Sequence, residues 1–127
     1  MSDTISELQG LGVLICAPDG AKLRKDRDAV DLIGEALHAG AATVAVPVEC
    51  FDEDFFHLRT RILGEIVQKF VQYRRRLVIV GAISRYLAES SSFTAFVVEA
   101  NRGNDIWFVG DLSELQARLA GTDSCSH

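Results

Sequence analysis

Residues 55–73 carry the longest helical pattern in this 127-residue chain, and they lead directly into an apolar strand at 77–80. Large side chains recur at the spacing of one broad helix face, at Phe55, Leu58, Ile62, Ile66, Phe70 and Tyr73. Gly64 falls in the middle of this pattern, where glycine costs about 1 kcal/mol relative to alanine. We therefore expect one long amphipathic helix, with Gly64 marking the close approach of another backbone or a partner helix.

The other segments alternate between strand and helix patterns. Strands are expected at 11–17, 42–48, 77–81 and 105–109, and a further short strand at 21–25 could pair with the first as a hairpin. Helices are expected at 29–38, at 84–103 with an interruption at 90–92, and at 112–119. Residues 1–10 are read as a polar lead-in, either frayed or forming a short helical turn. The alternation predicts the α/β class, with four to five mostly parallel strands and crossover helices. We expect a single compact domain over 1–120 and a disordered polar tail over 121–127.

Charge and composition exclude several classes of protein. The net charge of −5 argues against a nucleic-acid binder, which is normally basic over one face, and against attachment to an anionic membrane. No apolar run approaches the roughly 18 residues that span a bilayer, and the N-terminal residues lack the basic-then-apolar order of a signal peptide. Three cysteines without paired spacing indicate reduced thiols. We therefore expect a cytoplasmic protein.

Recognisable signatures of catalysis or cofactor binding are absent from the sequence. Neither GxGxxG nor GxxxxGK[ST] occurs, and no GxSxG motif is present. The three histidines are far apart in sequence and are not grouped with cysteines, so we expect no metal site. No cofactor is expected either. If a ligand binds, the carboxyl ends of the strands are the usual place, and these supply Glu49, Cys50, residues 81–84, Gly110 and Asp111.

Two groups of polar residues are the candidate binding sites. The first lies on the helix at 55–73 and consists of Arg59, Arg61, Gly64, Glu65, Gln68 and Lys69. It is either a partner- or ligand-contacting patch or a ladder of surface ion pairs, since Arg61 and Lys69 lie four residues from Glu65. The second consists of Glu99, Asn101 and Arg102, and it is either the solvated end of a helix or part of a cleft.

The basic trio Arg74, Arg75 and Arg76 suits the C-terminus of a helix, with contact to a phosphate as the alternative.

Three segments together carry a family resemblance. They are Phe55-Phe56-x-Leu58-x-Thr60 running into Gly64-Glu65-Ile66-x-Gln68-Lys69-Phe70-x-x-Tyr73, then Leu77 to Gly81, then Phe96-Val97-x-Glu99-x-Asn101-Arg102-Gly103 ahead of Phe108-Val109. This pattern, over most of residues 28–120, resembles the bacterial family of domain of unknown function 4180 (DUF4180). Where the family has a Gly-Leu-Ala-like step before Gly-Glu, this chain has Arg61-Ile62-Leu63. The family has no established activity, so the resemblance implies a fold more than a function.

The order of elements also resembles the STAS fold of anti-sigma-factor antagonists, an analogy of architecture. In those regulators a phosphorylatable Ser or Thr opens the helix after the third strand. Residues 49–56 contain neither, so we expect no phospho-switch. The favoured hypothesis is a non-enzymatic regulatory or interaction module that binds a protein partner or forms a homodimer. The alternative is a small-molecule-binding or enzymatic domain with a cleft near Glu65, Asn101 and Arg102.

Overall fold

The fold is a five-stranded sheet whose strands lie side by side in chain order, β1-β2-β3-β4-β5. The computed structural model describes residues 4–8, 11–16, 23, 25–51, 53–57 and 61–125. β1 pairs with β2 in antiparallel fashion, and β2, β3, β4 and β5 pair in parallel. The strands are β1 (Thr4–Leu8), β2 (Leu11–Ile15), β3 (Thr43–Pro47), β4 (Arg76–Val80) and β5 (Ile106–Val109).

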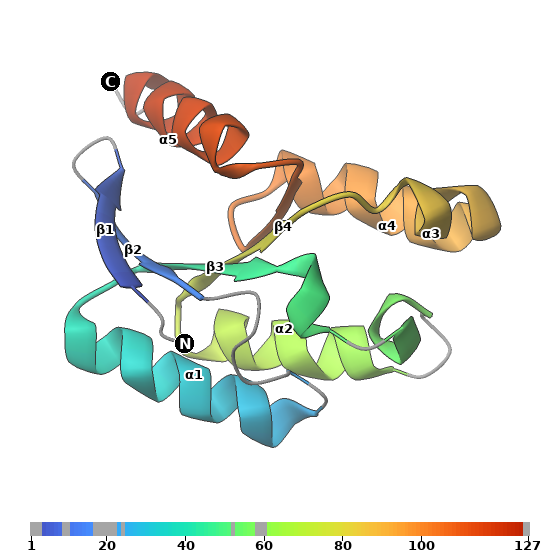
Figure 1. Ribbon diagram of the computed structural model, residues 1–127, viewed down its shortest axis with the longest axis horizontal. Coiled ribbons are helices and arrows are strands. Elements are labelled where there is room, and N and C mark those ends of the chain that lie inside the picture. Colours follow the sequence, from blue (N-terminus) through green and yellow to red (C-terminus); the bar gives the residue numbers. More distant parts are fainter. Residues whose placement is uncertain are drawn as a thin grey trace.

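Helices cover both faces of this sheet (Figure 1). Because each crossover steps to the next strand in the same direction, right-handed connections put their helices on one common face. That face carries helices α1, α2 and α4, and α5 lies on the other side of the sheet. The helices are α1 (Asp26–Ala39), η1 (Val48–Cys50), η2 (Glu53–Phe56), α2 (Ile62–Gln72), α3 (Ser84–Glu89), α4 (Ser91–Arg102) and α5 (Leu112–Cys125).

The hydrophobic core follows the alternation of side chains along the strands. Val44, Leu77 and Phe108 point toward α1, α2 and α4, where they join the larger buried cluster. Their chain neighbours point the other way, and Trp107 and Val109 pack with Leu115 and Leu119 of α5. Both faces of the central strands are therefore buried, which is why residues 42–48 and 77–81 read as nearly continuous apolar runs.

The structure confirms the predicted class, a single α/β domain with a mostly parallel sheet and crossover helices. One pairing was predicted wrongly. The antiparallel partner of β2 is β1, within the segment that was read as a polar lead-in, and not residues 21–25. Within 21–25, Leu23 forms a single parallel bridge with Phe51, while residues 21, 22 and 24 lie outside the described part of the chain.

The long helix expected over 55–73 is two elements. η2 ends at Phe56 and α2 begins at Ile62, while Leu58, Arg59 and Thr60 lie outside the described residues. Arg61 precedes α2 with φ 65°, a left-handed conformation that cannot belong to a right-handed helix. Phe55, Ile66 and Phe70 of the predicted apolar face share one core, whereas Tyr73 at its end is 42% exposed. The apolar pattern therefore identified part of the buried face but not the break within it.

At the other end of the chain, the predicted tail begins too early. α5 extends to Cys125, so residues 121–125 are helical where a disordered tail was expected from 121 onward.

Candidate functional site

The outer face of α2 is the first candidate site. Gly64, Glu65 and Gln68 are exposed, and Val71 keeps 44% of its surface accessible. A shallow, open depression of about 470 Å³ runs along this flank, lined by Gly64, Val67, Gln68, Val71 and Gln72. The opposite side of α2 buries Leu63, Ile66 and Phe70 in the core, which fixes the direction in which the flank faces.

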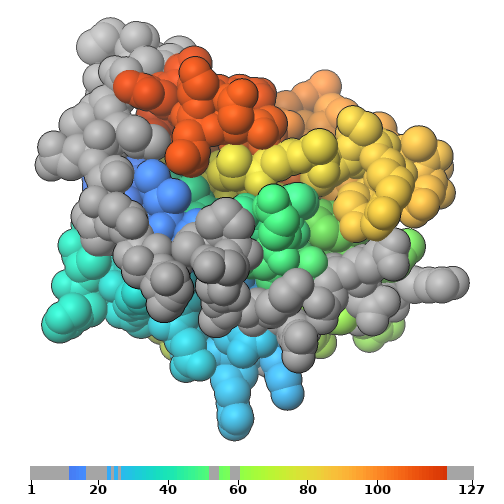
Figure 2. Space-filling view, in the orientation of Figure 1, coloured from blue at the N-terminus to red at the C-terminus, as the bar shows by residue number. Residues whose placement is uncertain are grey.

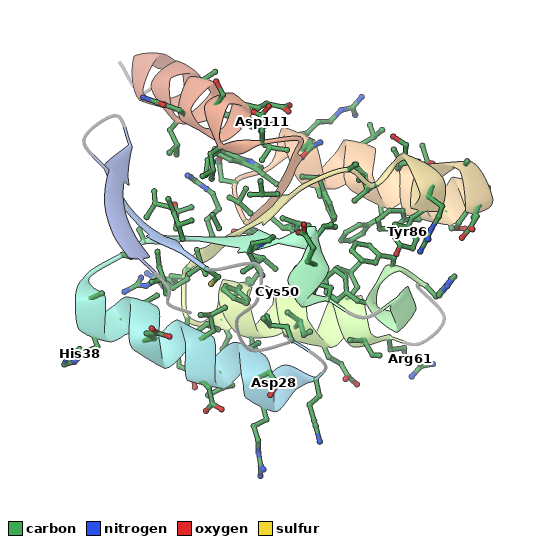
Figure 3. All side chains as sticks on the ribbon, in the orientation of Figure 1. Asp28, His38, Cys50, Arg61, Tyr86 and Asp111 are labelled. Atoms are coloured by element: carbon green, nitrogen blue, oxygen red, sulfur yellow. The ribbon has the colours of Figure 1, made fainter. Side chains whose placement is uncertain are left out.

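The ion-pair ladder expected on this helix does not form. Within the described part of the chain, Glu65 makes no ion pair with Arg61 or Lys69. The reason lies at the start of α2. The Glu65 N–H donates to the Arg61 carbonyl at 3.0 Å, as in a helix. Because the Arg61 backbone is left-handed, however, its side chain does not follow the helical repeat. Figure 3 shows Arg61 directed away from the body of the domain. Arg59, another predicted member of the patch, lies outside the described residues.

The second predicted group is split between two roles. Arg102 Nη1 donates to Glu99 Oε2 at 3.3 Å in a pair whose side chains are 72% and 74% exposed, so these two residues form the solvated helix end. Asn101 is a structural link: its Oδ1 accepts the backbone N–H of Phe108 at 2.8 Å, and its carbonyl accepts Arg118 Nη2 at 2.7 Å. Its amide oxygen thus joins α4 to β5.

The structure does not bring Glu65 together with Asn101 and Arg102. α2 and α4 both run back against the direction of the strands they connect. Glu65 is in the first turn of α2, near the carboxyl edge of the sheet, whereas Asn101 and Arg102 are in the last turn of α4, near the amino edge. The cleft that the alternative hypothesis placed between these residues is therefore not assembled.

A pocket of about 450 Å³ does occur at the carboxyl edge of the parallel strands. Figure 2 shows the ends of β2 (blue), β3 (green) and β4 (yellow) beneath α5 (orange-red). Four of the residues predicted from the strand ends line it. Cys16, which directly follows β2, was not among those predictions, because they did not include the end of that strand. Its lining is Ile15, Cys16, Ala45, Pro47, Glu49, Val80, Gly81, Gly110, Asp111 and Leu112.

Asp111 and Glu114, two acidic residues at this edge, stabilise the start of α5. Asp111 Oδ1 accepts the backbone N–H of Glu114 at 2.9 Å, and Glu114 Oε1 accepts that of Gly110 at 2.7 Å. This reciprocal arrangement satisfies backbone donors at the start of α5. Cys50, which was also predicted at this edge, instead lies in the interior with 1% exposure (Figure 3).

The described residues also show neither a metal-binding cluster nor a membrane-spanning helix. No group of three His, Cys, Asp or Glu side chains there is arranged to hold a metal ion. No described helix is long and apolar enough to cross a membrane.

Comparison with known proteins gives one match. A family model described as domain of unknown function (DUF4180) matches residues 8–119, most of the chain. No curated protein and no solved structure matches significantly.

Proposed function

This chain belongs to the DUF4180 family, as its motifs predicted, and from that premise we propose that it is a non-enzymatic regulatory module of the cytoplasm that works by protein–protein contact. The contact surface is the outer face of α2, and the partner is a second copy of the chain. The order of elements, which resembles that of STAS regulators, is consistent with a module of this kind but supports it only by analogy.

Gly64 is the observation that carries the proposal. A glycine inside an exposed helix lowers helix stability by about 1 kcal/mol. Gly64 differs from the equally exposed Gly34 of α1 because it lines an open depression beside Val67 and Val71. Within the described residues, a Cβ at Gly64 would meet nothing within 4 Å, so contacts inside one copy do not require the glycine. A second helix could approach closely at this point, beside the apolar surface of Val67 and Val71.

The charges around Gly64 favour a second copy as the partner. A two-fold interface joins the same surface of both subunits, so it must be complementary to itself. Glu65 and Lys69 place both signs of charge along α2, and Glu65 has no ion-pair partner among the described residues. In an antiparallel pairing of two α2 helices, Glu65 of each copy would face a basic residue of the other.

The rival proposal, small-molecule binding, now has its best support in the carboxyl-edge pocket and not near Glu65. That pocket lies where ligands of parallel α/β sheets usually bind, and its volume falls within the range of ligand sites. It predicts a monomer that carries a defined extra mass, which distinguishes it from the homodimer.

The decisive experiment compares the native mass spectrum and sedimentation velocity of three full-length proteins: wild type, Gly64→Arg and Gly34→Arg. Gly34 is the matched control, because it is an exposed glycine within α1 that also has nothing within 4 Å of a built Cβ. Both substitutions replace a helical glycine with a good helix former, so neither should unfold the domain.

We expect wild type and Gly34→Arg to be dimers and Gly64→Arg to be a monomer. A wild-type monomer at all concentrations, or a Gly64→Arg protein that still forms the dimer, would overturn the proposal. A complex with a different protein through the same face would replace the second copy as the partner.

A further inference from the structure

The amino edge of the sheet holds a pocket of about 390 Å³ that the proposed function does not use. Three consecutive arginines that follow α2 form one part of its wall. The rest comes from β2, from the end of α2, and from residues at or before the starts of β3 and β5. We call it the arginine pocket; its polar lining is Thr43, Arg74, Arg75, Arg76, Asn104 and Asp105.

Arg74 occupies a backbone conformation that favours glycine. Its φ is 58°, and it follows the last residues of α2 in a Schellman motif. The Arg74 N–H donates to Val71 O at 3.0 Å, and the Arg75 N–H donates to Phe70 O at 2.9 Å. Glycine fills this position in most such motifs because it adopts a positive φ without steric cost. The chain therefore places an arginine in the pocket wall at a cost in backbone free energy.

Arg75 contains a buried donor without a partner. Its Nη1 donates to Arg74 O at 3.1 Å, but its Nε is buried and forms no hydrogen bond with any residue that the structure describes. Buried side-chain donors are almost always satisfied, and an exception calls for a specific explanation such as a bound water or ion. Because this Nε is itself inaccessible to solvent, an acceptor oxygen would reach it only after the Arg75 side chain shifts toward the pocket.

Arg76 completes the basic wall of the pocket and also lies over the ring of Trp107. Its Nε donates to Asn104 O at 2.9 Å, and its guanidinium lies 4.1 Å from the centre of the Trp107 ring. Arg118 lies over the same ring, also at 4.1 Å. Burial and repulsion from Arg118 lower the pKa of Arg76, while Asp105 opposes that shift. A bound anion would offset the repulsion between the two arginines.

Helix ends account for only part of this arrangement. α1, α2 and α4 all end at the amino edge, and cations there compensate the negative ends of the helix dipoles. That effect explains basic residues near the edge, but it explains neither the strained backbone of Arg74 nor the unsatisfied Nε of Arg75. The helix ends and Asp105 oppose an anion, so its binding must depend on direct contact with the arginine guanidinium groups.

From these observations we propose that the arginine pocket binds the phosphate group of a small anionic ligand. Planar guanidinium forks match the geometry of phosphate oxygens, and Arg is the residue most used for such recognition. The arginine pocket adjoins the proposed dimer face, with which it shares Val71. Its arginines follow the end of α2, however, whereas Gly64 lies in the first turn, so the two proposals are tested by substitutions at opposite ends of the helix.

Trp107 is the only tryptophan in the chain, and although it does not line the pocket, Arg76 of the pocket wall lies over its ring, so its fluorescence should respond to changes at Arg76. The experiment titrates the full-length protein with inorganic phosphate, and separately with adenosine monophosphate, at constant ionic strength with chloride as the reference anion. Calorimetry follows the same titrations as a second readout. We expect saturable binding of both phosphate compounds and none of chloride. Saturation by adenosine monophosphate alone would assign the pocket to a phosphorylated metabolite and not to free phosphate.

Two variants test whether Arg74 contributes to phosphate binding. Arg74→Gly relieves the backbone strain, so it should fold at least as well as wild type yet bind phosphate at least about tenfold more weakly. Arg102→Gln is the matched control, because Arg102 is exposed and pairs with Glu99 outside the pocket, and its affinity should equal that of wild type. Equal responses to phosphate and chloride in both readouts, or unchanged affinity in Arg74→Gly, would overturn the proposal.

Discussion

The backbone N–H of Phe108 donates to the Asn101 side-chain oxygen at 2.8 Å, and this bond covers the outer edge of β5. Leu77 N–H donates to Asp105 O and Gly81 N–H donates to Val109 O, so the odd-numbered residues of β5 face β4. Phe108 N–H therefore points away from the sheet, toward the open edge. No further strand of the described part of the chain pairs with β5 on this side, so the Asn101 side chain accepts the Phe108 N–H instead. The bond protects the edge of β5 from pairing with a strand of another molecule.

We expect Asn101→Ala to lower the free energy of unfolding by about 1–3 kcal/mol, because it leaves the Phe108 N–H buried without an acceptor. Urea denaturation followed by circular dichroism measures the change. Arg102→Ala is the control, because it removes only an ion pair between two side chains that are each more than 70% exposed. It should change the free energy of unfolding by less than about 0.5 kcal/mol. Equal losses in the two variants would show that the Asn101 bond contributes nothing specific.

Gly81→Ala should destabilise the domain by about 2–4 kcal/mol. Gly81 has φ 140°, and an added Cβ would lie 2.9 Å from Val48 Cβ, so backbone strain and a steric clash add together. Thermal unfolding tests this prediction against Gly103→Ala, whose Cβ would lie 3.8 Å from its nearest neighbour and whose φ is −94°. In a Val48→Gly background, which removes the Cβ that would clash, Gly81→Ala should cost less free energy of unfolding, because only the backbone strain remains. If Gly81→Ala costs as much in that background as in the wild type, the contact with Val48 is not the cause.

Arg74→Gly should raise the free energy of unfolding by about 1 kcal/mol, because glycine adopts the positive φ at the end of α2 without steric cost. Gln72→Gly, two residues earlier and still within α2, should have the opposite sign and lower it by about 1 kcal/mol. Guanidinium denaturation of both variants gives the comparison. Destabilisation of both would mean that the Arg74 side chain contributes more to folding than its backbone conformation costs.

Ser90→Ala should cost about 1 kcal/mol, since the Ser90 hydroxyl oxygen accepts the Phe93 N–H at 3.1 Å and caps α4. Ser91→Ala, at the first residue of the same helix, removes an exposed hydroxyl and should be neutral within about 0.5 kcal/mol. Thermal unfolding of the two variants measures the difference. A loss at Ser91 as large as that at Ser90 would contradict the capping role.

Much of the fold could be predicted from the sequence because its determinants are local. The runs at 42–48 and 77–81 are apolar on both faces, which indicates buried parallel strands, and β3 and β4 lie there. Four residues of the carboxyl-edge pocket, Glu49, Gly81, Gly110 and Asp111, were predicted together, because parallel strands end at one edge. The serines at 90–92 were read as an interruption, and Ser90 does separate α3 from α4.

The errors arose where the deciding interaction lies outside the local pattern. Residues 4–8 carry no clear strand signal, and they form β1 because they pair with β2. The apolar spacing of 55–73 continues across a break set by the backbone of Arg61. Asn101 looks like an ordinary helix end until β5 brings the Phe108 N–H to it.

By itself, the sequence determined most of the strands and helices and much of the buried core, since hydrophobic spacing acts over a few residues. Only the tertiary structure decided the strand order, the separation of Glu65 from Asn101, and the assembly of Arg74, Arg75 and Arg76 with Asn104 and Asp105 in one pocket. These features depend on hydrogen bonds, charges and packing between residues about 30 or more positions apart, and the free energy of such contacts is not encoded in any local pattern.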